Sequence, residues 1–132
     1  MKASRMAMFV TLMVAIHLMV VILHALAHTR LAVNMTPLQN LYIVVVIMVA
    51  PVIAGVLVWT AFRRAGVLLF TFAMGGALVF GGYHHFIAAG VDDITRVPGG
   101  GWGALFRVTA VALALLEAGG CGLILWWRGG GS

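Results

Sequence analysis

Four long apolar segments limit the possible folds of this chain more than any other feature. They lie near residues 6–28, 38–60, 66–88 and 104–127. A helix needs about 20 apolar residues to cross the hydrocarbon core of a membrane. Of the 132 residues, 64% are hydrophobic and 8% charged, whereas a soluble domain has about a quarter charged residues. We therefore expect an all-α, polytopic membrane protein with a single four-helix domain over residues 1–128.

The two ends of the chain need separate interpretation. Ala25-Leu26-Ala27, at the end of the first segment, is similar to a signal-peptide cleavage site. The segment is longer than the apolar region of a signal peptide and contains His17 and His24, so we expect a retained helix. Residues 129–132 (Gly-Gly-Gly-Ser) are typical of an added linker and are excluded from the fold prediction.

The basic residues predict an orientation in the membrane. The net charge is +5, but the bases flank the apolar segments, whereas a nucleic-acid surface needs a contiguous basic patch. We therefore expect no nucleic-acid partner. One side of the membrane would carry Lys2, Arg5, Arg63, Arg64 and Arg128, and the other Arg30, Arg96 and Arg107 with Asp92 and Asp93. The positive-inside rule then predicts an up-down bundle with both termini in the cytoplasm and a bacterial-type inner-membrane location.

Motifs for several classes of enzyme are missing from the sequence. The single cysteine, Cys121, excludes an internal disulfide and a thiolate metal cage. The sequence contains no G-x-S-x-G, H-E-x-x-H or phosphate-binding glycine loop, which argues against a hydrolase or a kinase. Whether the chain is an enzyme stays open, and no catalytic residue is assigned.

Histidines are the strongest functional signal, because ionisable groups inside a membrane are costly and usually face an interior site. His17, His24 and His28 are spaced by seven and four residues, which places them on one stripe of the first helix. His24 and His28, at i and i+4, form a common half-site for a divalent metal. We expect this stripe to face the interior of the bundle.

The third helix is expected to supply the partner histidine. Ala73, Ala77, Gly81 and His84 share one narrow face, where small residues allow close packing. This geometry directs His84 into the interior and leaves His85 on the flank of the same face. A second small face, formed by Gly75 and Gly82, predicts a contact with a second copy of the chain or with a larger membrane complex.

The candidate ligands are expected to lie at similar depths in the membrane. The predicted metal ligands all lie near the outer end of the bundle: His24, His28, His84, His85, Asp92 and Asp93. This nitrogen and oxygen donor set suits zinc, copper, iron or nickel. The pair His24 and His84 would equally serve bis-histidine ligation of haem b. Redox chemistry and metal handling both fit such a site.

Glu117 is the single carboxylate within a predicted span, and its depth is similar to that of His17. The two residues are expected to form a proton relay or a second metal position. They also support an alternative function, a small proton-coupled transporter, while a third alternative is an accessory subunit whose histidines are hydrogen-bonded core residues. Asp92 and Asp93 have a structural interpretation too, as neutralising partners of Arg96 or Arg107.

Overall fold

The computed structural model describes the backbone of residues 2–129 and the side chains of residues 3–123. Its helices are α1 (Lys2–Arg30), α2 (Pro37–Tyr42), α3 (Ala50–Leu57), α4 (Arg63–Gly82) and α5 (Gly101–Gly129), with two π-helical segments, η1 (Ile43–Val49) and η2 (Tyr83–Ile87). Of the expected linker at residues 129–132, Gly129 is the last residue of α5 and the rest lies outside the described residues.

Four helical stretches are long and apolar enough to cross a membrane: Ala3–Arg30, Pro37–Leu57, Arg63–Ile87 and Gly101–Leu123. Large apolar side chains cover their outer faces; Leu38, Phe72 and Val79 are each more than 70% exposed. In water such a surface would be strongly unfavourable, whereas lipid tails are as apolar as leucine. The all-α prediction is confirmed, and the helices indicate a multi-pass membrane protein.

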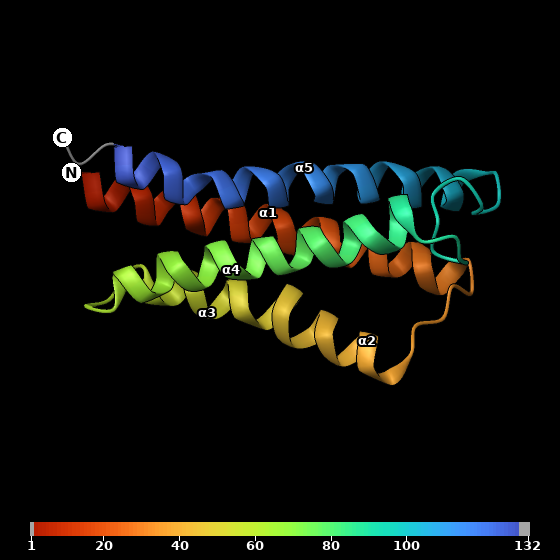
Figure 1. The fold of residues 1–132 in the computed structure, drawn as a ribbon, viewed down its shortest axis with the longest axis horizontal. Helices are drawn as coiled ribbons and strands as arrows, with labels where there is room; N and C mark the ends of the chain where they lie inside the picture. The colour runs from red at the N-terminus through yellow and green to blue at the C-terminus, as the bar shows by residue number, and fades with distance from the viewer. Residues whose placement is uncertain (1, 130–132) are drawn as a thin grey trace.

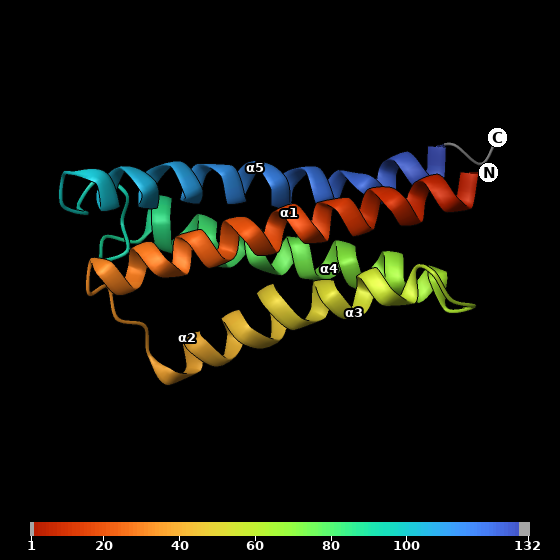
Figure 2. The same ribbon diagram turned by 180° about the vertical axis from the view of Figure 1, so that it is seen from behind.

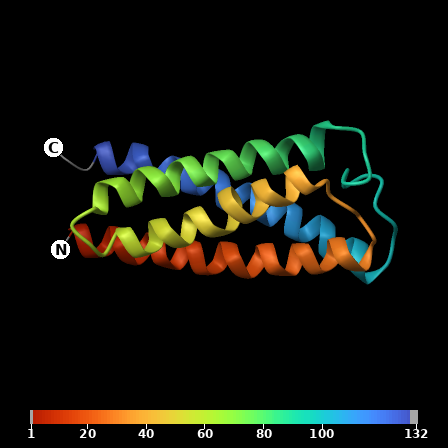
Figure 3. The same cartoon turned by 90° about the horizontal axis from the view of Figure 1, so that it is seen from below.

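The four stretches alternate in direction, as the short connections predicted (Figure 1). The first residues of α1, the end of α5 and the turn between α3 and α4 lie at one end of the bundle. Figure 3 shows the loops of residues 31–36 and 88–100 together at the opposite end, which we call the loop end. α5 packs against α1 and α4, and α3 packs against α4 and α1.

The second stretch leans away from the bundle toward the loop end (Figure 2). It begins with a capping box, in which Thr36 and Gln39 bond each other's backbone N–H groups and Pro37 occupies the first helical turn. Further along, η1 precedes Pro51, which has no N–H to donate to the preceding turn. The wider hydrogen-bond pattern of η1 accommodates this loss and joins α2 to α3 as one continuous rod.

The hydrophobic core differs between the two ends of the bundle. At the end that holds the termini, the buried core residues among those whose side chains the structure describes are apolar and include Val10, Val14, Val67, Phe70 and Met74. Toward the loop end the buried residues include polar ones: His17, His24, His85, Asp92, Thr109 and Glu117. The fold therefore concentrates its buried polar groups in the half of the bundle nearer the loop end.

The glycines of the expected second small face of α4 have different surroundings. A Cβ added to Gly75 would lie 3.7 Å from the Sγ atom of Cys121 in α5. A Cβ added to Gly82 would meet nothing within 4 Å. Gly75 thus contributes to packing within the chain, and contact with a second copy of the chain stays a prediction.

Candidate metal centre

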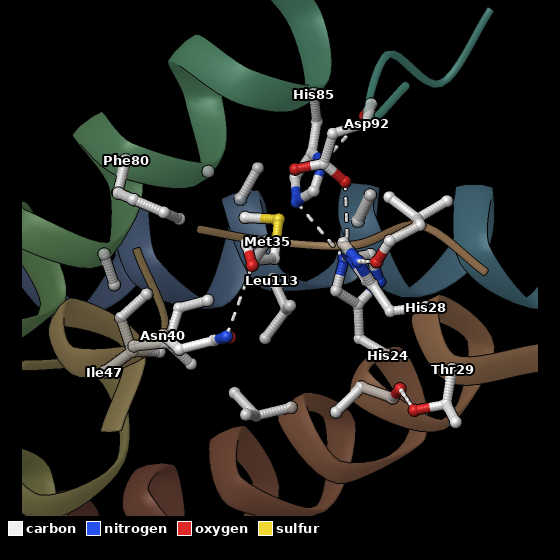
Figure 4. Close-up of a pocket in the computed structure, with 18 of the residues that line it drawn as sticks. His24, His28, Thr29, Met35, Asn40, Ile47, Phe80, His85, Asp92 and Leu113 are labelled. Carbon is white, nitrogen blue, oxygen red and sulfur yellow. Dashed lines mark hydrogen bonds and ion pairs between the residues drawn. The ribbon is translucent and has the colours of Figure 1, made fainter. Parts of the chain in front are cut away.

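Three imidazoles meet at the loop end of the bundle. The Nε2 atom of His24 lies 3.1 Å from Nε2 of His28 and 3.2 Å from Nε2 of His85. One ligand atom from each of the three residues falls within 4.8 Å of the others, close enough to hold one metal ion. Figure 4 shows these rings and the carboxylate of Asp92 turned toward one another from α1, η2 and the following loop.

Local helix geometry explains which histidines meet. His24 and His28 lie one turn apart on α1, so both rings point the same way. His85 belongs to η2, where the i→i+5 pattern places more residues in each turn than an α-helix does. Residues in η2 are therefore rotated backward relative to an ideal α-helix. This rotation brings His85, the flank residue of the predicted α-helical face, toward α1.

Each of the three imidazoles is anchored through its Nδ1 atom. His28 Nδ1 lies 3.4 Å from the carbonyl oxygen of Val33, and His85 Nδ1 lies 3.0 Å from the carbonyl oxygen of Asp92. A carbonyl can only accept, so both Nδ1 atoms act as donors. His24 Nδ1 lies 2.8 Å from the Thr109 hydroxyl, which donates its single hydrogen to the carbonyl of Leu105 or Phe106. The Thr109 oxygen therefore accepts from His24.

These anchors determine where the lone pairs are. A neutral imidazole that donates through Nδ1 carries its lone pair on Nε2. In these neutral tautomers all three lone pairs point into one small space, and that of His28 also faces the Asp92 carboxylate, so these groups repel one another unless a proton or a metal ion lies between them. Four nitrogens arranged tetrahedrally around zinc, at about 2.05 Å each, would be roughly 3.3 Å apart. The observed separations of 3.1 and 3.2 Å are close to that spacing.

Asp92 adds negative charge to the same space. Its Oδ1 atom lies 3.1 Å from Nε2 of His28 and 3.3 Å from Nδ1 of His85. Both carboxylate oxygens are buried and have no hydrogen-bond partner among the described residues. Burial by itself raises the pKa of Asp92, but the close contacts with His28 and His85 outweigh burial and hold the pKa well below its ordinary value. An ionised, buried carboxylate of this kind needs a cation.

Outer contacts keep the three rings in place. The ring of Phe106 is fully buried and packs against them, with centroids 4.7 Å from His24, 4.9 Å from His28 and 5.4 Å from His85. Arg107 holds the loop that carries Asp92 by donating to the carbonyls of Ile94, at 3.0 Å, and Val97, at 2.7 Å. Such supporting contacts orient the ligands of metal sites.

Two of the expected ligands lie away from the cluster. The Nε2 atom of His84 is 3.5 Å from the side-chain nitrogen of Gln39, and its ring packs on Phe80 and Tyr83. Asp93 accepts from the backbone N–H of Thr95 at 2.8 Å and from the Thr95 hydroxyl at 2.7 Å, and these bonds lower its pKa. Asp93 also contacts Arg96, as expected if its role is to neutralise that arginine.

The remaining two candidates form a separate buried pair. His17 Nε2 lies 3.2 Å from Oε1 of Glu117, and both side chains are almost fully buried. The similar depths of the two residues in the sequence had predicted this contact. The Nδ1 atom of His17 is buried without a hydrogen-bond partner among the described residues.

Thr109 and Phe106 are members of the site that sequence reasoning missed. One signal for Thr109 was available, since it lies two turns before Glu117 on α5, a spacing that keeps two residues on the same helix face. No comparable signal was available for Phe106, because the sequence alone does not distinguish a phenylalanine that faces lipid from one that packs against a site.

A cavity of about 460 Å³ extends from the three imidazoles toward Glu117. Its walls come from α1, the loop after it, α2, η1, α4 and α5, and Figure 4 shows Asn40, Ile47, Phe80 and Leu113 around it. The lean of the second helical stretch leaves room for this space. The metal centre is thus bordered by a cavity on its inner side.

No family model, curated protein or solved structure matches this chain. The site is therefore characterised by its own geometry: three close histidines, two of them buried, among helices long and apolar enough to span a membrane. That geometry supports a site that could bind a metal ion.

Proposed function

We propose that this protein is an inner-membrane bundle that binds one transition-metal ion through Nε2 of His24, His28 and His85. The observation that carries this proposal is the convergence of three imidazole lone pairs, each set by a hydrogen bond at the opposite ring nitrogen. Asp92 serves either as a fourth ligand or as the outer partner of His85, since it contacts both His28 and His85. Its negative charge favours a divalent cation over an uncharged ligand.

The donor set narrows the choice of metal. Three imidazoles with one carboxylate suit zinc. Copper(II), nickel and iron also bind imidazole nitrogen well, whereas copper(I) prefers sulfur ligands. Zinc accepts such a tetrahedral site without a geometric preference of its own. We therefore use zinc as the reference metal and cobalt(II) as its spectroscopic substitute.

An ion explains the contacts better than haem does. Two imidazoles on opposite faces of a porphyrin would place their ligating nitrogens roughly 4 Å apart with the macrocycle between them. The Nε2 atoms of His24 and His85 are 3.2 Å apart, and His28 occupies a third side of the same space. The haem pair expected from the sequence required His84, which instead lies beside Gln39.

The positive-inside rule supports placing the loop end, and with it the metal, on the periplasmic side of the membrane. A site there serves metal delivery, sensing or metal-dependent chemistry on molecules that reach the outer leaflet. The contact between His17 and Glu117 favours proton-coupled transport as a second candidate function. Against transport, the core between this pair and the termini is apolar.

Metal analysis of the purified protein tests the proposal. The protein is purified in detergent with a tag that contains no histidine, stripped with a chelator and reloaded with zinc or cobalt(II). We expect one ion per chain, a cobalt absorption spectrum typical of tetrahedral coordination, and a higher thermal unfolding temperature with metal, because a ligand that binds only the folded state stabilises it. The triple variant His24→Ala/His28→Ala/His85→Ala should show none of these. A wild-type protein that binds no ion, or that carries a haem absorption band, would overturn the proposal.

A further inference from the structure

The cavity below the metal centre combines polar groups with apolar walls. Its polar lining includes His24, His28 and His85 of the metal centre and the carboxylate of Glu117. The walls come mainly from Val21, Ile43, Ile47, Ala77, Phe80 and Leu113. Its volume of about 460 Å³ lies within the range of cavities that bind small organic molecules, roughly 300–1,000 Å³.

Gly81 lies between the metal centre and Glu117. A Cβ built on Gly81 would lie 3.6 Å from Cδ2 of His85 and 4.0 Å from Oε2 of Glu117. The imidazole and the carboxylate therefore border the same point, and only the missing side chain of Gly81 keeps that point open. A molecule bound to the metal beside His85 would have Glu117 Oε2 within reach across this gap.

Glu117 is held in position by His17. Its Oε1 atom contacts Nε2 of His17, which leaves Oε2 on the side of Gly81 and the cavity. His17 itself does not line the cavity and is completely buried, next to an apolar core. His17 acts as a positioning residue.

We propose that the cavity binds a small, largely apolar molecule with one ionisable hydroxyl group, whose oxygen coordinates the metal and whose proton passes to Glu117. In this step the O–H bond breaks and its electron pair stays on oxygen, which forms the metal–oxygen bond. The proton forms a new O–H bond at Glu117 Oε2, so nothing is oxidised or reduced. The inference rests on the metal site proposed above, and zinc can accept a further ligand by becoming five-coordinate.

The shape and chemistry of the cavity select this class of ligand. A charged molecule would lose its hydration against the apolar walls, and a purely apolar one would leave the metal and Glu117 without a partner. A single hydroxyl satisfies both groups, because the oxygen serves the metal and the hydrogen serves the carboxylate. Phenols have this composition, with an aromatic ring to contact the apolar walls of the cavity.

4-Nitrophenol tests the inference directly, because its phenol and phenolate forms absorb at different wavelengths. It is titrated into the zinc-loaded protein in detergent, at a pH where the free compound is mostly protonated. We expect saturable binding with the spectrum of the phenolate, and neither binding nor the phenolate spectrum in the zinc-free protein. Glu117→Gln should keep zinc but weaken 4-nitrophenol binding by roughly tenfold or more, because an uncharged amide cannot accept the proton of the phenol.

Gly81→Ala provides a second variant in case Glu117→Gln does not fold. Its added methyl group makes only ordinary contacts, at 3.6 and 4.0 Å, but it fills the gap between His85 and Glu117. Gly82→Ala is the matched control, since it makes the same change one residue later, where nothing lies within 4 Å. We expect Gly81→Ala to lose phenolate formation and Gly82→Ala to retain it.

The outcomes separate this inference from the proposed function. If the wild-type protein does not bind zinc, the proposed function fails and the inference fails with it. If zinc binds with the expected ligands but 4-nitrophenol does not bind as phenolate, or binds equally well to Gly81→Ala and Glu117→Gln, the inference alone is overturned.

Discussion

The Nδ1 atom of His24 donates to Oγ1 of Thr109 across a distance of 2.8 Å, which links α1 to α5 at the metal centre. The Thr109 hydroxyl can only accept from His24, because its own hydrogen goes to the carbonyl of Leu105 or Phe106. This contact places the His24 lone pair on Nε2, where it faces His28 and His85. Thr109 therefore prepares His24 for metal binding without touching the metal.

Thr109→Val should weaken zinc binding by about 10- to 100-fold, the usual effect of removing an outer partner of a metal-bound histidine. Valine keeps the shape of threonine but offers no acceptor for His24. Thr71→Val is the matched control, since Thr71 also bonds a carbonyl within its own helix, that of Val67, but lies apart from the metal centre. Competition with a coloured zinc chelator measures both affinities. Equal losses in the two variants would mean that Thr109 acts only on folding.

His85→Ala and His84→Ala should differ sharply although the residues are neighbours. His85→Ala removes one of the three proposed metal-binding nitrogens, so we expect zinc affinity to fall at least about 100-fold. This loss is larger than the usual effect of removing a residue that only hydrogen-bonds a metal ligand. His84→Ala removes a contact with Gln39 and should change zinc affinity little. Isothermal titration of the stripped proteins compares the two, and a larger loss in His84→Ala would contradict the π-helical register of η2.

Hydropathy and α-helical periodicity were sufficient to predict the helices and to place His24 and His28 together at the candidate site. The four spans follow from segment length, and the neighbouring positions of His24 and His28 follow from their i and i+4 spacing on α1. The contact between His17 and Glu117 follows from their similar depths in the membrane. Each of these inferences needs only regular helix geometry, which the chain keeps along α1 and α5.

The third ligand depends on a departure from regular geometry. A π-helical segment carries no reliable sequence signature, so a count at 100° per residue directs His84 inward, whereas η2 brings in His85. The difference between Asp92 and Asp93 arises in a loop, where consecutive residues point in directions set by turn bonds such as those from Thr95. Helix periodicity contains no information about either choice.

Zinc binding should weaken as the pH falls, because protons compete with the metal for the same nitrogen lone pairs. Asp92 should not contribute to this loss. Its pKa lies below the ordinary value, so the carboxylate keeps its charge above that range and loses it only in stronger acid. Zinc titrations between about pH 8 and pH 5 test both statements. Asp92→Asn should lower the zinc affinity throughout this range, because an amide brings no negative charge to the site, and an unchanged affinity would contradict this role of Asp92.

Replacing one member of the His17–Glu117 pair should destabilise the fold without removing the metal. His17→Leu leaves the buried carboxylate without its partner, and Glu117→Leu leaves the imidazole without one, so each should cost roughly 1–3 kcal/mol of unfolding free energy. The double variant should cost less than the two single losses together, because it leaves neither polar group unpaired. Thermal unfolding of the zinc-free proteins in detergent measures the three values. Additive losses of unfolding free energy would mean that the two side chains contribute separately.

The zinc affinity of His17→Leu should equal that of the wild type, because the metal centre is built from other residues. A loss of zinc binding in His17→Leu would place the metal beside Glu117 instead.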